Sequence, residues 1–242
     1  MRLVRRFWWI VPLVIVIAAV GFIAWASTTN PLEPAAETAL VTDSAVTVDS
    51  SRWLVFKPSA EATTGLIFYP GGKVNPAAYA PLARAAAEAG YLAVIVPMPL
   101  NLAILDTSAA DAVIDAFPSV EHWALAGHSL GGSMAARYAA ANPDKIDGLA
   151  LIAAFSDVDL SGSGIATRVI YGTRDGLATV EEVEGGASLL PADAAWVKID
   201  GGNHGQFGWY GEQAGDNPAT ISHEEQAAQT TDALLALLAR IS

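Results

Sequence analysis

The 242-residue sequence contains no cysteine, which excludes disulfide bonds, thiolate metal sites and cysteine nucleophiles. It also has no His-x-x-x-His or EF-hand spacing, and no Gly-x-Gly-x-x-Gly follows the first buried strand. We therefore expect neither a metal nor a dinucleotide cofactor. Basic residues are scarce: 13 Lys and Arg stand against 25 Asp and Glu, a net charge of -12. Such an acidic surface repels polyanions, so we expect no nucleic-acid partner.

A basic N-terminus precedes a long uncharged segment. Residues 1–6 hold three arginines, whereas residues 7–26 carry no charge and, as a helix, would cross roughly the 30 Å core of a bilayer. Trp8, Trp9 and Trp25 lie near the two ends, where headgroups would be. The pattern predicts a single-pass transmembrane helix over residues 7–26 at the cell membrane, with the N-terminus inside and the following domain outside.

The small residues at Ala24 and Ala26 also fit a signal-peptidase site. A secreted protein, cleaved near Ala26, is therefore the alternative, and the domain is exported in both cases. Residues 27–45 are rich in Thr, Pro, Ala and Glu without apolar periodicity, which predicts a tether. Residues 46–242 are enough for one sizeable domain.

Apolar strands alternate with helical patterns in residues 46–242. The alternation predicts an α/β fold with a mostly parallel central sheet, helices on both faces and an antiparallel pair at 46–48 and 53–56. In such a sheet, ligands bind at the carboxyl ends of the strands. We expect the other strands at 65–69, 91–97, 122–126, 147–154, 168–171 and 195–199, and helices at 76–90, 108–117, 133–141, 179–187 and 223–241.

One turn between an apolar strand and a helix has the pattern Gly-x-Ser-x-Gly. It spans Gly127 to Gly131 and places Ser129 at its centre. A sharp strand-to-helix turn of this type strains the serine backbone and leaves no room for side chains two residues to either side. The pattern predicts that Ser129 is a nucleophile, while an ordinary glycine-rich turn is the alternative.

Two further strand ends carry an acid and a histidine. Asp175 follows the strand at 168–171, and His204 follows the strand at 195–199. The order serine, acid, histidine is the one expected when three such loops form a catalytic triad on this type of sheet. The alternatives for the acid are Asp157 and Asp159, and the other histidines, at less suitable places, are His122, His128 and His223.

These motifs resemble the α/β-hydrolase superfamily over residues 46–241, in the small single-domain branch of dienelactone hydrolases and bacterial carboxylesterases. The dienelactone enzymes use cysteine where this chain has Ser129. The resemblance implies the α/β-hydrolase fold and a Ser129–His204–Asp175 triad that works through an acyl-enzyme. We expect the backbone N–H of Leu130 as one oxyanion donor, and the resemblance implies Gly72 or Lys73 as the other.

The connection between residues 154 and 168 is too short for a helical cap, which predicts an open, shallow pocket. Its expected lining includes Gly71, Phe207, Trp209 and Tyr210; the alternative for the three aromatic residues is that they only pack their loop. Small neutral carboxylic esters are the substrates that suit such a pocket on an acidic protein. The alternatives are an acyltransferase or a peptidase with the same triad, or a non-catalytic, membrane-tethered binding module.

Overall fold

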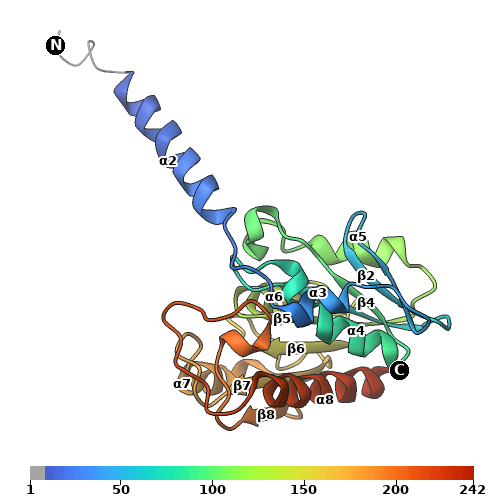
Figure 1. Ribbon diagram of the computed structural model, residues 1–242. Coiled ribbons are helices and arrows are strands. Elements are labelled where there is room, and N and C mark those ends of the chain that lie inside the picture. The colour runs from blue at the N-terminus through green and yellow to red at the C-terminus, as the bar shows by residue number, and fades with distance from the viewer. Residues whose placement is uncertain (1–8) are drawn as a thin grey trace.

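The computed structural model describes residues 9–242. The basic residues 1–6, and Phe7 and Trp8 of the predicted membrane segment, lie outside the described residues. Helix α2 (Ile10–Ala26) stands away from a domain that holds all the strands of the described chain (Figure 1).

The domain is built on an eight-stranded sheet with the order β1-β2-β4-β3-β5-β6-β7-β8. The pair β1–β2 is antiparallel and the sheet is mostly parallel, as the sequence predicted; β2–β4 is a second antiparallel pair. The strands are β1 (Val46–Asp49), β2 (Leu54–Pro58), β3 (Thr64–Tyr69), β4 (Leu92–Ile95), β5 (His122–His128), β6 (Gly148–Ile152), β7 (Ala166–Gly172) and β8 (Ala195–Ile199).

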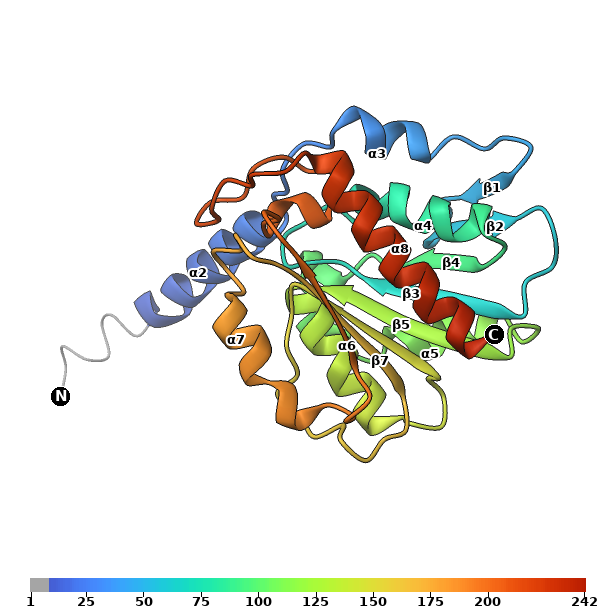
Figure 2. The ribbon, with the colours of Figure 1, turned by 90° about the horizontal axis from the view of Figure 1, so that it is seen from below.

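Helices cover the sheet on both sides. Helices α4 and α8 contact each other on one face, and α5 and α6 lie on the opposite face (Figure 2). Every residue of β3, β4 and β6 is buried, which is why these strands are continuously apolar rather than alternating. The helices of the domain are α3 (Pro34–Ala39), α4 (Ala80–Glu88), α5 (Ala109–Ala116), α6 (Leu130–Ala141), α7 (Val180–Gly185) and α8 (His223–Ile241).

Short 3-10 helices occupy several of the connections between these elements. The ones that bear on the site are η1 (Pro76–Tyr79), η2 (Pro99–Asn101) and η3 (Ala103–Leu105), which follow β3 and β4, and η5 (Gly205–Phe207), which follows β8.

Helix α2 contains 17 residues, which at a rise of about 1.5 Å per residue extend about 26 Å. Within residues 9–242, no helix meets the combined requirement of length and apolar character for crossing a membrane. The transmembrane helix predicted over residues 7–26 is therefore not supported by the described part of the chain.

Residues 27–45 lie against the domain rather than forming a free tether. Ala36 of α3 is fully buried and Ala39 nearly so. The guanidinium group of Arg84, on α4, donates to the carbonyl oxygens of Ala39 and Val41. Short apolar side chains and satisfied backbone carbonyls thus hold a segment whose composition alone suggested a linker.

The turn between β5 and α6 has the strained geometry that the sequence predicted. Ser129 has φ 53° and ψ -123°, which is unusual for a residue with a side chain. A Cβ on Gly131 would lie 2.2 Å from the carbonyl oxygen of Tyr69, and one on Gly127 would lie 2.4 Å from the carbonyl group of Gly131. Only glycine fits at both positions.

We expect Gly131→Ala to lower the free energy of unfolding by about 3 kcal/mol, because the new methyl group collides with rigid strand backbone. Urea unfolding of the purified protein measures this change. Gly162→Ala is the matched control, since nothing lies within 4 Å of a Cβ there, and it should change stability by less than about 0.5 kcal/mol. Equal stability of the two variants would contradict the packing described for the turn.

Candidate active site

Ser129, Asp175 and His204 all lie at the carboxyl edge of the sheet. Ser129 follows β5, Asp175 follows β7 and His204 follows β8. Because these strands run parallel, the loops that leave them share one edge. The backbone N–H of Ser129 donates to the carbonyl oxygen of Ile152 at 2.9 Å, which fixes the serine turn on the end of β6.

Asp175 and His204 form a buried pair. The Nδ1 atom of His204 lies 2.8 Å from Oδ2 of Asp175, and the two side chains are 1% and 0% exposed. The other carboxylate oxygen of Asp175 accepts backbone N–H groups from Leu177 at 2.8 Å and Ala178 at 2.7 Å. The carboxylate is therefore fully hydrogen-bonded, and its orientation is fixed by the turn that carries it.

The second ring nitrogen of His204, Nε2, is buried and has no hydrogen-bond partner among residues 9–242, Ser129 included. The structure thus brings the acid and the histidine together directly, and it places the serine on the same edge without a hydrogen bond to the ring. Catalytic hydrogen bonds are often long in proteins without substrate. An unpaired buried nitrogen at this place is suited to accept a proton.

The alternative acids are engaged elsewhere. Asp157 pairs with Arg137, whose guanidinium group holds the pKa of that carboxyl below its usual range. Asp159 accepts the N–H of Ser161 at 2.9 Å and its hydroxyl at 2.7 Å. Both side chains are engaged in these contacts, so Asp175 is the one of the three candidate acids that reaches His204.

The remaining alternative histidines also have other partners. His122 lies at the amino end of β5, with Nδ1 3.6 Å from the carboxylate of Asp147. His223 begins α8, with Nδ1 3.3 Å from the carboxylate of Glu33.

The loop after β3 carries the two amides predicted as alternatives for the second oxyanion donor, and one of them is already bonded. The N–H of Lys73 donates to the carbonyl oxygen of Asn101 at 2.8 Å. The N–H of Gly72 has no partner among the described residues, and a Cβ on Gly72 would lie 3.3 Å from the Leu130 side chain. Leu130 opens α6, so its own N–H has no partner within the helix. These contacts favour Gly72 over Lys73.

His128 and Tyr79 form a buried network that the sequence did not reveal. The Tyr79 hydroxyl accepts the N–H of Gly71 at 3.1 Å and lies 2.8 Å from Nδ1 of His128. A hydroxyl has one proton and two lone pairs, so Tyr79 holds both the Gly71 amide and the His128 ring by hydrogen bonds. Burial lowers the pKa of His128 well below its ordinary value, and the neighbouring His204 lowers it further.

This network connects the loop after β3 to the histidine ring. The ring centroids of His128 and His204 are 4.5 Å apart. A Cβ on Gly71 would lie 2.7 Å from Nδ1 of His128 and 2.9 Å from the Tyr79 hydroxyl, so Gly71 lines the network and needs to be glycine. His128 directly precedes Ser129, and this adjacency was the one feature of the sequence that could have indicated that His128 lies in the network beside His204.

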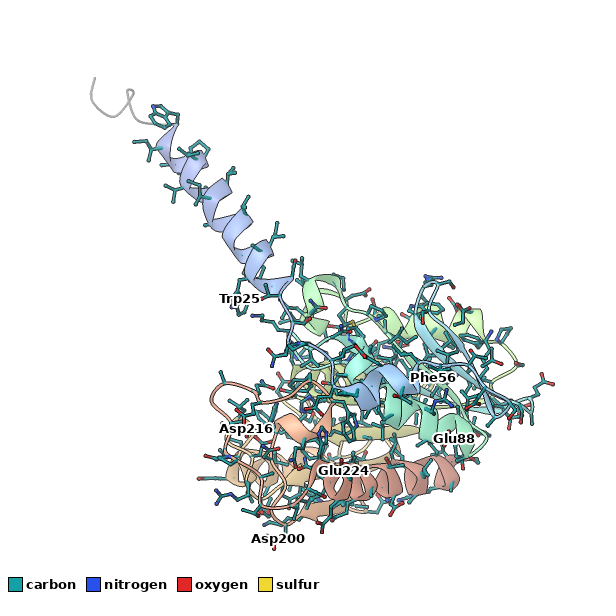
Figure 3. The ribbon with its side chains drawn as sticks, in the orientation of Figure 1. Trp25, Phe56, Glu88, Asp200, Asp216 and Glu224 are labelled. Atoms are coloured by element: carbon teal, nitrogen blue, oxygen red, sulfur yellow. The ribbon has the colours of Figure 1, made fainter. Side chains whose placement is uncertain are left out.

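Asp216 is a second residue that the sequence did not single out. Its carboxylate accepts the N–H of Gly176 at 3.0 Å and the N–H of Gly205 at 2.8 Å. These amides directly follow Asp175 and His204, so one carboxylate ties together the two loops that carry the pair. Figure 3 labels Asp216 in the long connection before α8.

The three aromatic residues after His204 differ in their roles. The indole ring of Trp209 stacks on His223 with ring centroids 3.7 Å apart, and the backbone N–H of Trp209 donates to the carbonyl oxygen of Ala78. That is the packing role left open by the sequence. Phe207 is buried with its ring centroid 5.8 Å from that of His128, and buried Tyr210 bonds Gln213 at 2.7 Å.

Within residues 9–242, no group of three or more His, Asp or Glu side chains is arranged to hold a metal ion. The chemistry available at this edge is that of a hydroxyl, an imidazole, a carboxylate and backbone amides.

A model of the alpha/beta hydrolase family matches residues 65–228. No curated protein sequence matches the chain significantly. The matched residues include the Ser129 turn and the loops of Asp175 and His204.

Several solved structures have a similar fold. The esterase domain of a Rhodothermus marinus protein is 14% identical, with 78% of this chain and 92% of that chain covered and a TM-score of 0.58. A hyperthermophilic esterase from the archaeon Pyrobaculum calidifontis is 18% identical, with 84% and 90% covered and a TM-score of 0.58. A putative hydrolase from Agrobacterium vitis is 15% identical, with 80% and 97% covered and a TM-score of 0.60. At these identities the likeness shows the fold alone.

The lowered pKa of His128 predicts a pH dependence of stability. The unfolded chain protonates this histidine near pH 6.5, whereas the folded protein does so only well below that pH. Below about pH 6.5 the unfolded state therefore binds more protons, and His128 should lower the free energy of unfolding by up to about 1.4 kcal/mol per pH unit.

Urea unfolding of the wild type and of His128→Gln between pH 7.5 and 5.0 measures this contribution. The variant should lose stability less steeply than the wild type as the pH falls. His122→Gln, at the exposed end of the same strand, is the matched control and should keep the slope of the wild type. Parallel curves for the wild type and His128→Gln would contradict the buried neutral ring.

Proposed function

The chain belongs to the alpha/beta hydrolase family, and we propose that it is a serine hydrolase that cleaves small neutral carboxylic esters. The observation that carries this proposal is the buried Asp175–His204 hydrogen bond of 2.8 Å, which leaves Nε2 unpaired on the edge that holds the strained Ser129 turn. Solved relatives named as esterases, from Rhodothermus marinus and Pyrobaculum calidifontis, support the assignment to esters.

In the proposed reaction, the Ser129 hydroxyl attacks the ester carbonyl carbon while Nε2 of His204 takes its proton. The carbonyl oxygen becomes an oxyanion held by the N–H groups of Gly72 and Leu130. Collapse of this intermediate expels the alcohol, which takes the proton from His204, and leaves the acyl group on Ser129.

A water molecule then repeats the sequence. It attacks the acyl carbon as His204 takes its proton, and collapse of the second intermediate returns that proton to Ser129 and releases the carboxylic acid. Asp175 keeps the imidazole in the tautomer with its proton on Nδ1 and stabilises the imidazolium that forms in both halves. Its two backbone N–H bonds fix the orientation of the carboxylate toward the ring.

Acyl transfer to an alcohol would use the same residues, because the acyl-enzyme is shared. Product analysis in the presence of a competing alcohol separates the two outcomes. A non-catalytic binding module would hold no reactive serine.

We also propose a location for the protein. It places the hydrolase domain outside the cell, with residues 7–26 either retained as an anchor or removed near Ala26. N-terminal sequencing of the mature protein decides between these alternatives. A chain that begins at Ser27 would exclude the anchor.

We expect a fluorophosphonate probe to label the wild-type protein at Ser129 and to leave Ser129→Ala unlabelled. Ser133→Ala is the matched control, since this serine lies one turn further along α6 with its hydroxyl bonded to the carbonyl oxygen of Phe155 at 3.0 Å. The control should be labelled like the wild type. Failure of the wild type to react at Ser129 would favour the non-catalytic binding module.

Asp175→Asn should lower kcat for p-nitrophenyl butyrate by about 10⁴-fold with little change in KM, because the amide favours the wrong tautomer of His204. Asp157→Asn, in the alternative position, should retain activity within about twofold. Initial rates over a range of substrate concentrations measure both. A large loss in Asp157→Asn with an active Asp175→Asn would reverse the assignment of the acid.

A further inference from the structure

A cleft of about 410 Å³ lies beside the loop that carries the proposed oxyanion donor. One wall is this loop, with Gly72 and Lys73. The facing wall is the end of α2 and the chain that follows it, from Trp25 to Asn30, and Tyr210 closes one side. Figure 3 shows Trp25 where α2 reaches the domain.

The N-terminal wall is held in place by side chains of the domain. Ala26 is fully buried, and its carbonyl oxygen accepts from the Asn101 side chain at 3.2 Å. The Asn30 side chain donates to the carbonyl oxygen of Glu212 at 3.0 Å, and Nζ of Lys73 lies 4.2 Å from the centre of the Trp25 ring. The segment is therefore a fixed wall of the cleft.

Asn101 connects this wall to the oxyanion loop. Its side chain bonds Ala26, and its carbonyl oxygen accepts the N–H of Lys73 at 2.8 Å. The position of the N-terminal segment and the conformation of the loop at Gly72 thus depend on the same residue.

The chemistry of the cleft is unusual for this protein. Its described lining has no carboxylate side chain, although the chain has 25 acidic residues. It has instead an indole ring, an ammonium group that forms no ion pair within the described residues, and hydroxyl and amide groups. These polar groups come from Lys73, Thr28, Thr29, Asn30 and Gln213.

Such groups match a ligand with several hydroxyl groups. Ammonium and amide N–H groups donate to hydroxyl oxygens, threonine and amide oxygens accept from hydroxyl protons, and the indole face packs on C–H groups. A hydrocarbon chain in this cleft would displace water from the polar groups without replacing its hydrogen bonds, which is unfavourable.

We propose that the cleft is the subsite for the alcohol half of the ester, and that it selects a polyol such as glycerol or a monosaccharide. The inference rests on the proposed esterase function. With the ester carbonyl oxygen at the N–H of Gly72, the bound alcohol extends along the loop into the cleft. The N-terminal segment thereby supplies the wall that a cap domain would otherwise provide.

The test compares two esters that share an acyl group, glyceryl 1-monobutyrate and propyl butyrate, with the full-length chain in detergent. The two alcohols differ only by two hydroxyl groups. We expect kcat/KM of the wild type to be about tenfold higher for the glyceryl ester, since two neutral hydrogen bonds together contribute about that factor.

Trp25→Ala and the double variant Thr28→Val, Thr29→Val should reduce this ratio to about two or less, mainly through a lower kcat/KM for the glyceryl ester. Trp9→Ala is the matched control, because Trp9 is 52% exposed and Trp25 is 54% exposed. The control should keep the tenfold ratio.

Equal kcat/KM of the wild type for the two esters would overturn the inference. So would a preference for the glyceryl ester that survives in both Trp25→Ala and the threonine double variant. In either case hydrolysis of propyl butyrate and labelling of Ser129 would leave the proposed function intact. Loss of labelling and of both hydrolyses in the wild type would instead refute the proposed function, and the subsite with it.

Discussion

The close approach of the turn at Ser129 to the end of β3 is the constraint on which the site depends. Gly131 packs its Cα against the Tyr69 carbonyl oxygen, and Gly127 packs against Gly131. A serine at φ 53° persists only where surrounding packing stabilises it. The same contact places the loop after β3, with Gly72, beside Leu130 at the start of α6, so one steric arrangement positions both Ser129 and these two amides.

Buried polar networks hold the imidazole of His204 from two sides. On one side, Asp175 fixes Nδ1, and Asp216 ties together the loops of both residues. On the other side, the neutral ring of His128 lies against His204 and is oriented by Tyr79. Hydrogen bonds at Nδ1 restrain both rings, while Nε2 of each ring has no partner among the described residues.

The N-terminal segment has a structural role in addition to any role in location. Residues 27–45 cover α4 and the loops near the site, and residues 25–30 border the cleft beside Gly72. The connection after β6 is short, so the domain has no cap inserted there.

The sequence by itself determined the alternation of strands and helices, the antiparallel pair at the edge and the Ser129 turn, because apolar periodicity and glycine sterics act locally. Its helix over 223–241 is confirmed to the residue, and the order of Ser129, Asp175 and His204 indicated their shared edge. Only the tertiary structure decided that Asp175 rather than Asp157 reaches His204, that Lys73 is already bonded through Asn101, and that Tyr79, His128 and Asp216 support the site. These contacts join residues far apart in the chain, and no local pattern encodes which distant polar groups meet once the sheet brings its strand ends together.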